Sequence, residues 1–275
     1  MKRIYALAFL SALFLSAAIF SCSKEDKNPV SGDEGQTVAL AAVKVNTDAL
    51  YDDVSMEVLQ VNTDAGLSAQ PTSVNACATI TVSSTDPAIW PKTVTIDYGT
   101  AGCTGVNGFV RKGKIIYTLS KKLINTGAVL NVTFDNYNVN GYKLEGTYTI
   151  TNNGSANGLN VSVQLVGGVV TYPAGNSYTK ETNTTWVQTA GQGTLTALDD
   201  EYDVSGNGTV SSSGNKLTAT SKGNLHRTVV CPNTVSGILD LTYNNIAGTL
   251  DFGSGTCDKS ALLTVAGKQY TVTLP

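Results

Sequence analysis

Three ionisable side chains are the strongest candidates for catalysis, namely Asp97, Asp251 and His226. His226 is the single histidine of the chain, and histidine is the side chain that exchanges a proton most readily near neutral pH. The two aspartates occupy equivalent places, each two residues before a glycine. They could act as acid and base on a glycosidic bond if folding placed them roughly 5–10 Å apart.

A structural role explains the same aspartates without catalysis. A turn aspartate often accepts a hydrogen bond from the backbone N–H two residues on, and Gly99 and Gly253 stand at those places. A catalytic acid and base need different surroundings, whereas Asp97 and Asp251 share theirs. We therefore favour turns at both sites. For His226 the spacing identifies no partner, which favours a position on the surface or at a sheet edge.

The two tryptophans, Trp90 and Trp186, are the candidates for ligand binding. A tryptophan presents a broad apolar ring with a polar edge, which suits stacking against a sugar. Trp90 is the better candidate because it lies in an expected loop between two prolines, Pro87 and Pro91. Packing against the protein core is the alternative for both rings, and it is the interpretation that we favour.

Metal binding has little support in the sequence. The acidic residues Asp199, Asp200, Glu201 and Asp203 could attract Ca²⁺, but they lack the alternating spacing and the glycine of an EF-hand loop. A solvated turn is the favoured interpretation. Zinc binding is also poorly supported, because the chain has no CxxC pair and a single histidine to supply ligands. We predict neither a metal site nor a cofactor.

The first 21 residues have the pattern of an export signal, with a basic start and an apolar stretch over 6–20. That stretch is short for a membrane span, which needs roughly 20 apolar residues. The segment Ile19-Phe20-Ser21-Cys22 resembles the lipobox of bacterial lipoproteins. The next residues, Ser23-Lys24-Glu25-Asp26, are similar to the export signal of Bacteroidota surface lipoproteins.

This resemblance implies that 1–21 is a lipoprotein signal peptide and that Cys22 carries lipid. The protein would then be anchored in the outer membrane and exposed at the cell surface, since a multiply acylated cysteine anchors stably. An ordinary signal peptide that leaves Cys22 as a free thiol is the alternative. The polar stretch 22–38 is typical of a flexible tether, and 39–275 is expected to form a single β-rich domain.

The charge balance argues against nucleic acid as a partner. The chain has 18 basic and 21 acidic residues, and two of the basic ones belong to the signal peptide. The remainder is acidic and has no Lys/Arg cluster, whereas nucleic-acid binding requires a basic patch. Charged residues make up 14 % of the chain against about 25 % in typical globular domains.

Two stretches, 77–121 and 231–275, repeat each other. Each carries two cysteines 26 residues apart and a corner of the type Asp-aromatic-Gly. An even number of cysteines in an oxidising compartment indicates disulfides. Alternating apolar and polar residues allow each stretch to fold as an antiparallel hairpin that brings its own cysteines together. We therefore predict the disulfides Cys77–Cys103 and Cys231–Cys257.

The two hairpins differ in how clearly their register can be predicted. In the first, clean alternation is expected to place Val82 opposite Tyr98. The second is expected to turn at Asn244-Asn245. There the apolar residues of the two strands lie on the same face of the sheet only after a one-residue slip or a bulge. Gly248 or Gly253 could absorb it.

One helix and many strands are expected in the mature chain. Leu50, Val54 and Val58 recur at helical spacing, which predicts a helix over 48–60. After residue 70 the period is two almost throughout, which predicts about fourteen or fifteen strands. Besides the two hairpins, the predicted strands are 114–119, 130–134, 143–151, 159–166, 178–187, 194–198, 202–210, 217–221 and 224–230.

The fold class that follows is all-β. Short strands joined by tight turns predict an antiparallel meander that forms a sandwich or a curled sheet. One short N-terminal helix and two disulfide-stapled hairpins complete it. A transmembrane barrel would also show alternating strands, but the strands here are often short and their aromatic residues form no paired girdles.

The functional expectation is a surface-anchored binding or adhesion lipoprotein that acts without catalysis. The membrane is its expected partner through the lipid anchor, and a glycan or a protein outside the cell is its expected ligand. One alternative is a hydrolase that acts on extracellular glycan or peptide. Another is a structural or assembly subunit of the cell surface, for which an exposed sheet edge would be the signature.

Overall fold

The computed structural model describes residues 32–65, 77–194 and 197–275. They form one helix, α1 (Gly32–Ala65), followed by fourteen strands. The strands are β1 (Thr79–Val82), β2 (Lys92–Asp97), β3 (Cys103–Thr104), β4 (Val110–Leu119), β5 (Val129–Val139), β6 (Tyr142–Asn152), β7 (Asn160–Thr171), β8 (Ser177–Ala190), β9 (Glu201–Ser212), β10 (Asn215–Thr228), β11 (Ser236–Tyr243), β12 (Ile246–Ser254), β13 (Ser260–Val265) and β14 (Lys268–Thr273).

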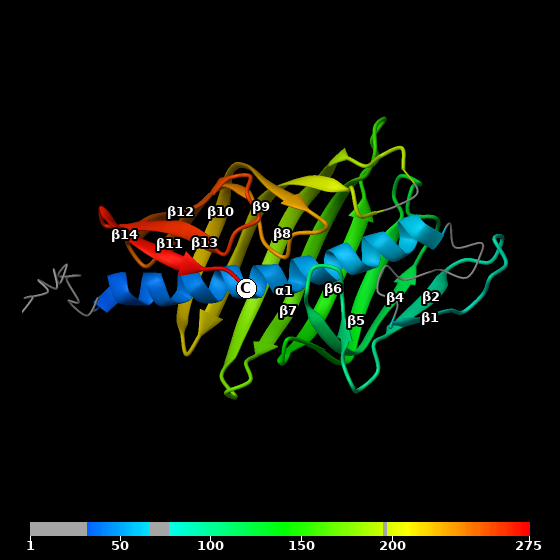
Figure 1. Cartoon of the computed structure of the whole chain (residues 1–275), viewed down its shortest axis with the longest axis horizontal. Coiled ribbons are helices and arrows are strands. Elements are labelled where there is room, and N and C mark those ends of the chain that lie inside the picture. Colours follow the sequence, from blue (N-terminus) through cyan, green and yellow to red (C-terminus); the bar gives the residue numbers. More distant parts are fainter. Residues whose placement is uncertain (1–31, 66–76, 195–196) are drawn as a thin grey trace, which may run out of the picture. The chain divides into compact units, whose positions relative to one another are not determined.

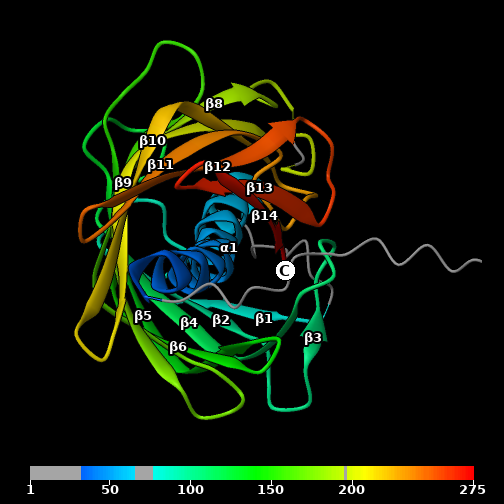
Figure 2. The same ribbon diagram turned by 90° about the vertical axis from the view of Figure 1, so that its left-hand side faces the viewer.

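All the strands belong to a single antiparallel sheet. Its order is β1-β2-β4-β5-β6-β7-β8-β9-β10-β11-β12-β13-β14, with β3 paired to β4. The sheet is therefore a meander that follows the chain, as predicted (Figure 1). Within the described residues, β1 and β14 are not paired with each other, so the sheet stays open. It curls around α1, which lies along its concave side (Figure 2).

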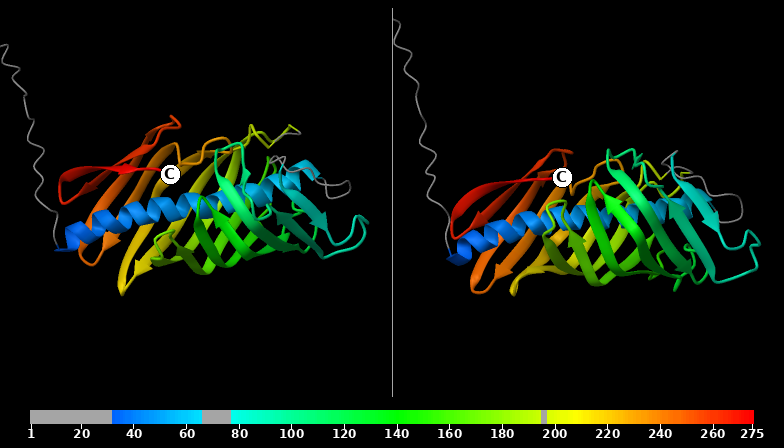
Figure 3. Two further views of the ribbon diagram at one scale, coloured as in Figure 1. Left: turned by 60° about the horizontal axis from the view of Figure 1, so that its bottom comes forward. Right: turned by 90° about the horizontal axis from the view of Figure 1, so that it is seen from below.

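Alternation along the strands separates a buried inner face from an exposed outer face. On β6, for example, Leu144, Tyr148 and Ile150 are buried, whereas Thr147 between them is exposed. The inner residues pack against α1 in two apolar clusters. One contains Ala49 to Val61 of the helix, and the other contains the earlier helical residues around Leu40. The strands cross the helix in both views of Figure 3.

The helix is much longer than the predicted range 48–60. It begins at Gly32, so that 32–38, expected to be tether, is helical. The reason is packing, because Leu40, Ala41 and Val45 are buried against the C-terminal strands. The rest of the predicted tether, like the signal peptide and Cys22, lies outside the described residues. The described helix is not both long and apolar enough to span a membrane.

Buried ion pairs hold the charged residues of α1 against the sheet. Arg111 of β4 binds Asp53 and also lies 3.1 Å from Glu57. Lys180 of β8 binds Asp48 in the same way one turn earlier on the helix. Arg111 and Asp53 are each only 1 % exposed, so the charges compensate each other in a dry interior where an unpaired charge would be very costly.

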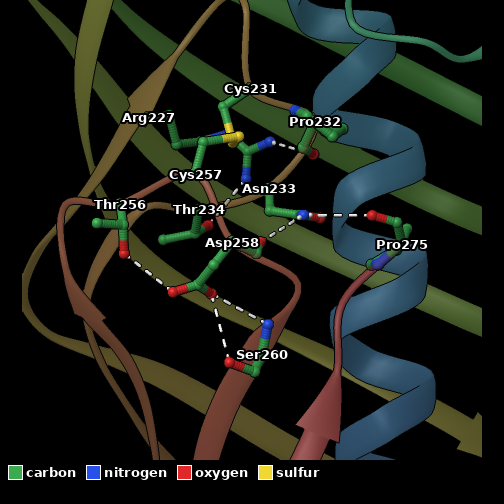
Figure 4. The surroundings of a disulfide bond; sticks show 10 residues. All are labelled: Arg227, Cys231, Pro232, Asn233, Thr234, Thr256, Cys257, Asp258, Ser260 and Pro275. Carbon is green, nitrogen blue, oxygen red and sulfur yellow. Dashed lines mark hydrogen bonds between the residues drawn. A yellow bond between two sulfur atoms is a disulfide. The ribbon is translucent and has the colours of Figure 1, made fainter.

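Both predicted disulfides are present. Cys77 is bonded to Cys103, and Cys231 is bonded to Cys257. Figure 4 shows the second bond beside Asn233, whose amide donates to two backbone oxygens. Through this amide the stapled loop is joined to the carbonyl of Pro275 at 3.2 Å. The second staple therefore also fixes the end of the chain.

The register predicted for the first hairpin is wrong. Val82 pairs with Val94 rather than with Tyr98, and Thr79 pairs with Asp97. Alternation cannot distinguish the two registers, because a shift by an even number of residues leaves every side chain on the same face. The disulfide still forms because Cys103 lies beyond β2, in the short strand β3.

The second hairpin turns at Asn244-Asn245 as predicted, with Tyr243 paired to Ile246. Its register shift lies between Ser236 and Ile238, which face Ser254 and Asp251. The extra residue thus falls on β12 beside Gly253, one of the two glycines expected to absorb it.

The repeat does not extend to strand pairing. Ile80 faces Ile96 in the first copy, and the equivalent positions in the second copy are Thr234 and Leu250. Leu250 instead faces Leu239, because a tight turn replaces the long loop of the first hairpin. The copies share their disulfide and their Asp-aromatic-Gly corner.

Three of the other predicted strands differ from the structure. Within 194–198, the described residues lie in turns rather than in a strand. The separate strands predicted at 217–221 and 224–230 are one long strand, β10, whose register shifts between Lys222 and His226.

Candidate functional site

The outer face of the sheet carries a continuous row of polar side chains, one from each of twelve strands. Each member is the cross-strand partner of the next, and all are at least partly exposed. We call this set the polar row. Its members are Thr93, Thr118, Asn131, Thr149, Gln164, Asn183, Asn207, Thr220, Asp240, Thr249, Thr264 and Gln269.

The polar row is almost uncharged. Asp240 is its single ionisable member, and the others end in a hydroxyl or an amide. Neighbouring strands lie about 4.8 Å apart, so hydrogen-bonding groups recur at that interval along the row. A second line of hydroxyls runs beside its centre. This line consists of Thr151, Ser162, Thr185 and Ser205.

Asp97 and Asp251 have the turn role that we favoured. The Gly99 N–H donates to Asp97 Oδ1 at 2.8 Å, and the Gly253 N–H donates to Asp251 Oδ1 at the same distance. The Gly99 N–H, together with Lys114 at 3.1 Å, lowers the pKa of Asp97. The two aspartates lie on β2 and β12, which β4 to β11 separate in the sheet. Each carboxylate is therefore occupied by its own turn.

His226 has two acidic partners that spacing did not reveal. Its Nδ1 lies 2.9 Å from Asp203 Oδ1, and its Nε2 lies 3.2 Å from Glu201 Oε2. The pairing of β9 with β10 brings the three together, since His226 faces Asp203 in the register. Both ring nitrogens are therefore engaged with carboxylates, which leaves neither facing a substrate. The arrangement favours a structural role for His226 over a proton shuttle.

The acidic residues 199–203 do not converge on one point. Asp199 accepts a hydrogen bond from Thr194, while the buried Asp200 accepts from Gln188 and Tyr202. In the described part of the chain, no group of three or more His, Cys, Asp or Glu side chains is arranged to hold a metal ion.

Both tryptophans pack against the core, Trp186 completely and Trp90 in part. Trp186 is fully buried, its Nε1–H donates to Thr184 at 3.1 Å, and its ring packs against Tyr202. It is a core residue and cannot stack on a ligand. Trp90 is half-buried against the core, and its ring faces Lys92, whose Nζ lies 5.1 Å from the ring centre.

A small pocket of about 40 Å³ lies beside α1. Lys44, Asp48 and Asp52 line it from the helix. Burial acts to raise the pKa of Asp48, but Lys180 and Lys44 outweigh it and hold that pKa below its ordinary value. Burial raises the pKa of Asp52, although Arg227 lies 2.8 Å away. The volume suits a water molecule rather than a sugar.

Comparison with known proteins gives no indication of function, so the outer face of the sheet is the main evidence for it. No protein-family model matches the chain, and no curated protein or solved structure is significantly similar to it. Sequence reasoning also missed the polar row, because its members become neighbours only once the register of twelve strands is known.

Proposed function

We propose that this chain is a lipid-anchored protein of the outer membrane that binds a neutral glycan chain outside the cell, without catalysis. The observation that carries the proposal is the polar row. A glycan chain repeats hydroxyl groups along its length, and each hydroxyl both donates and accepts a hydrogen bond. A regular series of hydroxyl and amide side chains complements such a polymer.

The distribution of charge supports a neutral ligand. The polar row has one carboxylate, Asp240, and no cation, so it offers little to a polyanion. The absence of catalysis is supported by the partners of the candidate residues. Both nitrogens of His226 are engaged with carboxylates, and Asp97 and Asp251 accept turn hydrogen bonds.

Removing hydrogen-bonding groups from the centre of the row should weaken binding. The variant Thr149→Val/Asn183→Val/Thr220→Val keeps side chains that suit a strand but removes three polar groups. Each hydrogen bond contributes about 0.5–1.5 kcal/mol, so we expect at least about a tenfold loss of affinity. The measurement is binding of the full chain, purified in detergent, to an array of neutral oligosaccharides.

The matched control is Thr79→Val/Thr104→Val/Thr271→Val, which changes exposed threonines outside the polar row. It should bind like the unmodified chain. Failure of the unmodified chain to bind any neutral glycan would contradict the proposal, as would equal affinities of the two triple variants. Release of new reducing ends during incubation would show catalysis and favour the hydrolase.

The anchor has a test of its own. Cys22→Ser should abolish incorporation of an alkyne-labelled fatty acid and move the protein from the membrane fraction to the soluble fraction. The control Ser23→Ala should remain labelled and membrane-bound. Labelling that persists in Cys22→Ser would show that Cys22 is not the site of acylation.

A further inference from the structure

A groove of about 610 Å³ opens on the surface where β4 and β5 lose their regular pairing. It lies at the end of these strands away from the polar row, since Lys112 on its wall is six residues from Thr118 along β4, or about 20 Å. Lys112 faces Asn138 of β5 in the register. Both line the groove, together with Asn136 and Asn140.

The backbone around the groove is held in an unusual conformation. Gly113 on β4 has φ +75°, and Asn136 on β5 has φ +50°. A Cβ at Gly113 would lie 2.2 Å from the carbonyl oxygen of Asn136, so only glycine fits this approach. A non-glycine residue in the left-handed region within a strand is uncommon and costs free energy. Such strain is concentrated at binding sites, and here both residues line the groove.

The lining residues are rich in donors and contain one charge. Lys112 is exposed and, among the described residues, has no carboxylate partner, whereas Lys114 and Lys143 are paired with Asp97 and Glu145. Among the residues that the structure describes, no aspartate or glutamate lines the groove. An unpaired ammonium group flanked by amides is suited to a carboxylate.

Asn140 is already oriented by the protein. Its Oδ1 accepts a hydrogen bond from the Val110 N–H at 2.8 Å, which leaves its amide N–H groups to donate elsewhere. Asn138 lies two residues earlier, on β5, and lines the same groove. The two amides can donate to sugar hydroxyls or to the second carboxylate oxygen, while Lys112 supplies the charge.

We propose that this groove binds the carboxylate of an acidic sugar, with Lys112 as the counter-charge and Asn138 and Asn140 as hydrogen-bond donors. The inference rests on the proposed function, because it adds an acidic recognition site to a glycan-binding surface. The second copy of the repeat lacks the site, since the position equivalent to Lys112 is Ala266.

The test uses trigalacturonic acid and its methyl ester, which share a backbone but differ in charge. Titration calorimetry of the full chain in detergent at about 0.1 M salt should show at least tenfold tighter binding of the acid. Lys112→Met should remove this preference, while Lys216→Met, which changes another exposed lysine of the outer face, should retain it. Equal affinities for acid and ester, or an unchanged preference in Lys112→Met, would overturn the inference.

The same measurements separate this inference from the proposed function. A neutral glycan should still bind to Lys112→Met, and the triple variant of the polar row should still prefer the acid. Binding of neutral glycans without any preference for the acid would overturn the groove alone. Tighter binding of a sulfated oligosaccharide than of trigalacturonic acid would also overturn it, because the assigned ligand is a carboxylate.

Discussion

Replacing Arg111 by methionine should lower the free energy of unfolding by about 3–5 kcal/mol. The Arg111 side chain is 1 % exposed and binds Asp53, with Nε donating to Oδ2 at 2.9 Å. It also compensates Glu57 at 3.1 Å. Methionine fills a similar volume, so the cost comes from removing the cation that compensates two buried carboxylates. The measurement is urea unfolding of the full chain, followed by fluorescence.

The matched control is Lys143→Met, which breaks a solvent-exposed ion pair of similar length. Lys143 lies 2.8 Å from Glu145, and the two side chains are 46 % and 48 % exposed. Exposed pairs contribute about 0–1 kcal/mol, so this variant should be almost as stable as the unmodified chain. Equal effects of Arg111→Met and Lys143→Met would show that the buried pair does not hold α1 to the sheet.

Loss of either disulfide should lower the free energy of unfolding nearly as much as Arg111→Met does. Each closes a loop with a sequence separation of 26 residues, for which the chain-entropy estimate is about 3.5 kcal/mol. The variants are Cys77→Ala/Cys103→Ala and Cys231→Ala/Cys257→Ala. Because the loops are equal in length, the two variants should lose similar stability in urea unfolding under non-reducing conditions.

The two disulfide variants should differ in the part of the sheet that loses stability. Removal of Cys77–Cys103 frees β1, an edge strand of four residues that is only partly buried. Hydrogen exchange should therefore accelerate in β1 and β2, while β11 to β14 remain protected. A loss below about 1 kcal/mol for either pair would contradict the view that these bonds staple the two ends of the sheet.

Most of the strands were predictable because each carries its own signal. A period of two identified the meander, and tight-turn residues such as Asn244-Asn245 fixed some of its turns. The pairing of cysteines also followed from local hairpins. The register of the first hairpin did not, because Val82 opposite Val94 and Val82 opposite Tyr98 give the same alternation.

The length of α1 was not predictable from local pattern. Polar residues such as Lys44, Asp48 and Asp53 interrupt its apolar face, and the helical spacing of apolar residues is clear only over 48–60. Their partners Lys180 and Arg111 lie far away in the sequence, so only the folded sheet shows that these charges point inward. The same long-range pairing hid the acidic partners of His226.

The candidate site was predictable only as a property of single strands. Alternation indicates that Thr149 and Gln164 face outward, but not that they stand side by side. That requires the register of the whole sheet, including its bulges. The groove beside Lys112 depends on the bulge at Gly113 and Asn136, for which the sequence offers no more than a glycine inside a strand.

Threonine-methyl NMR during a titration with neutral oligosaccharide tests the central claim most directly. We expect the methyl signals of Thr118, Thr149 and Thr220 in the polar row to shift together and to saturate. Those of Thr37 and Thr47, which are buried on α1, should stay in place. Shifts that avoid the polar row, or the absence of shifts with every neutral glycan, would contradict binding on the outer face.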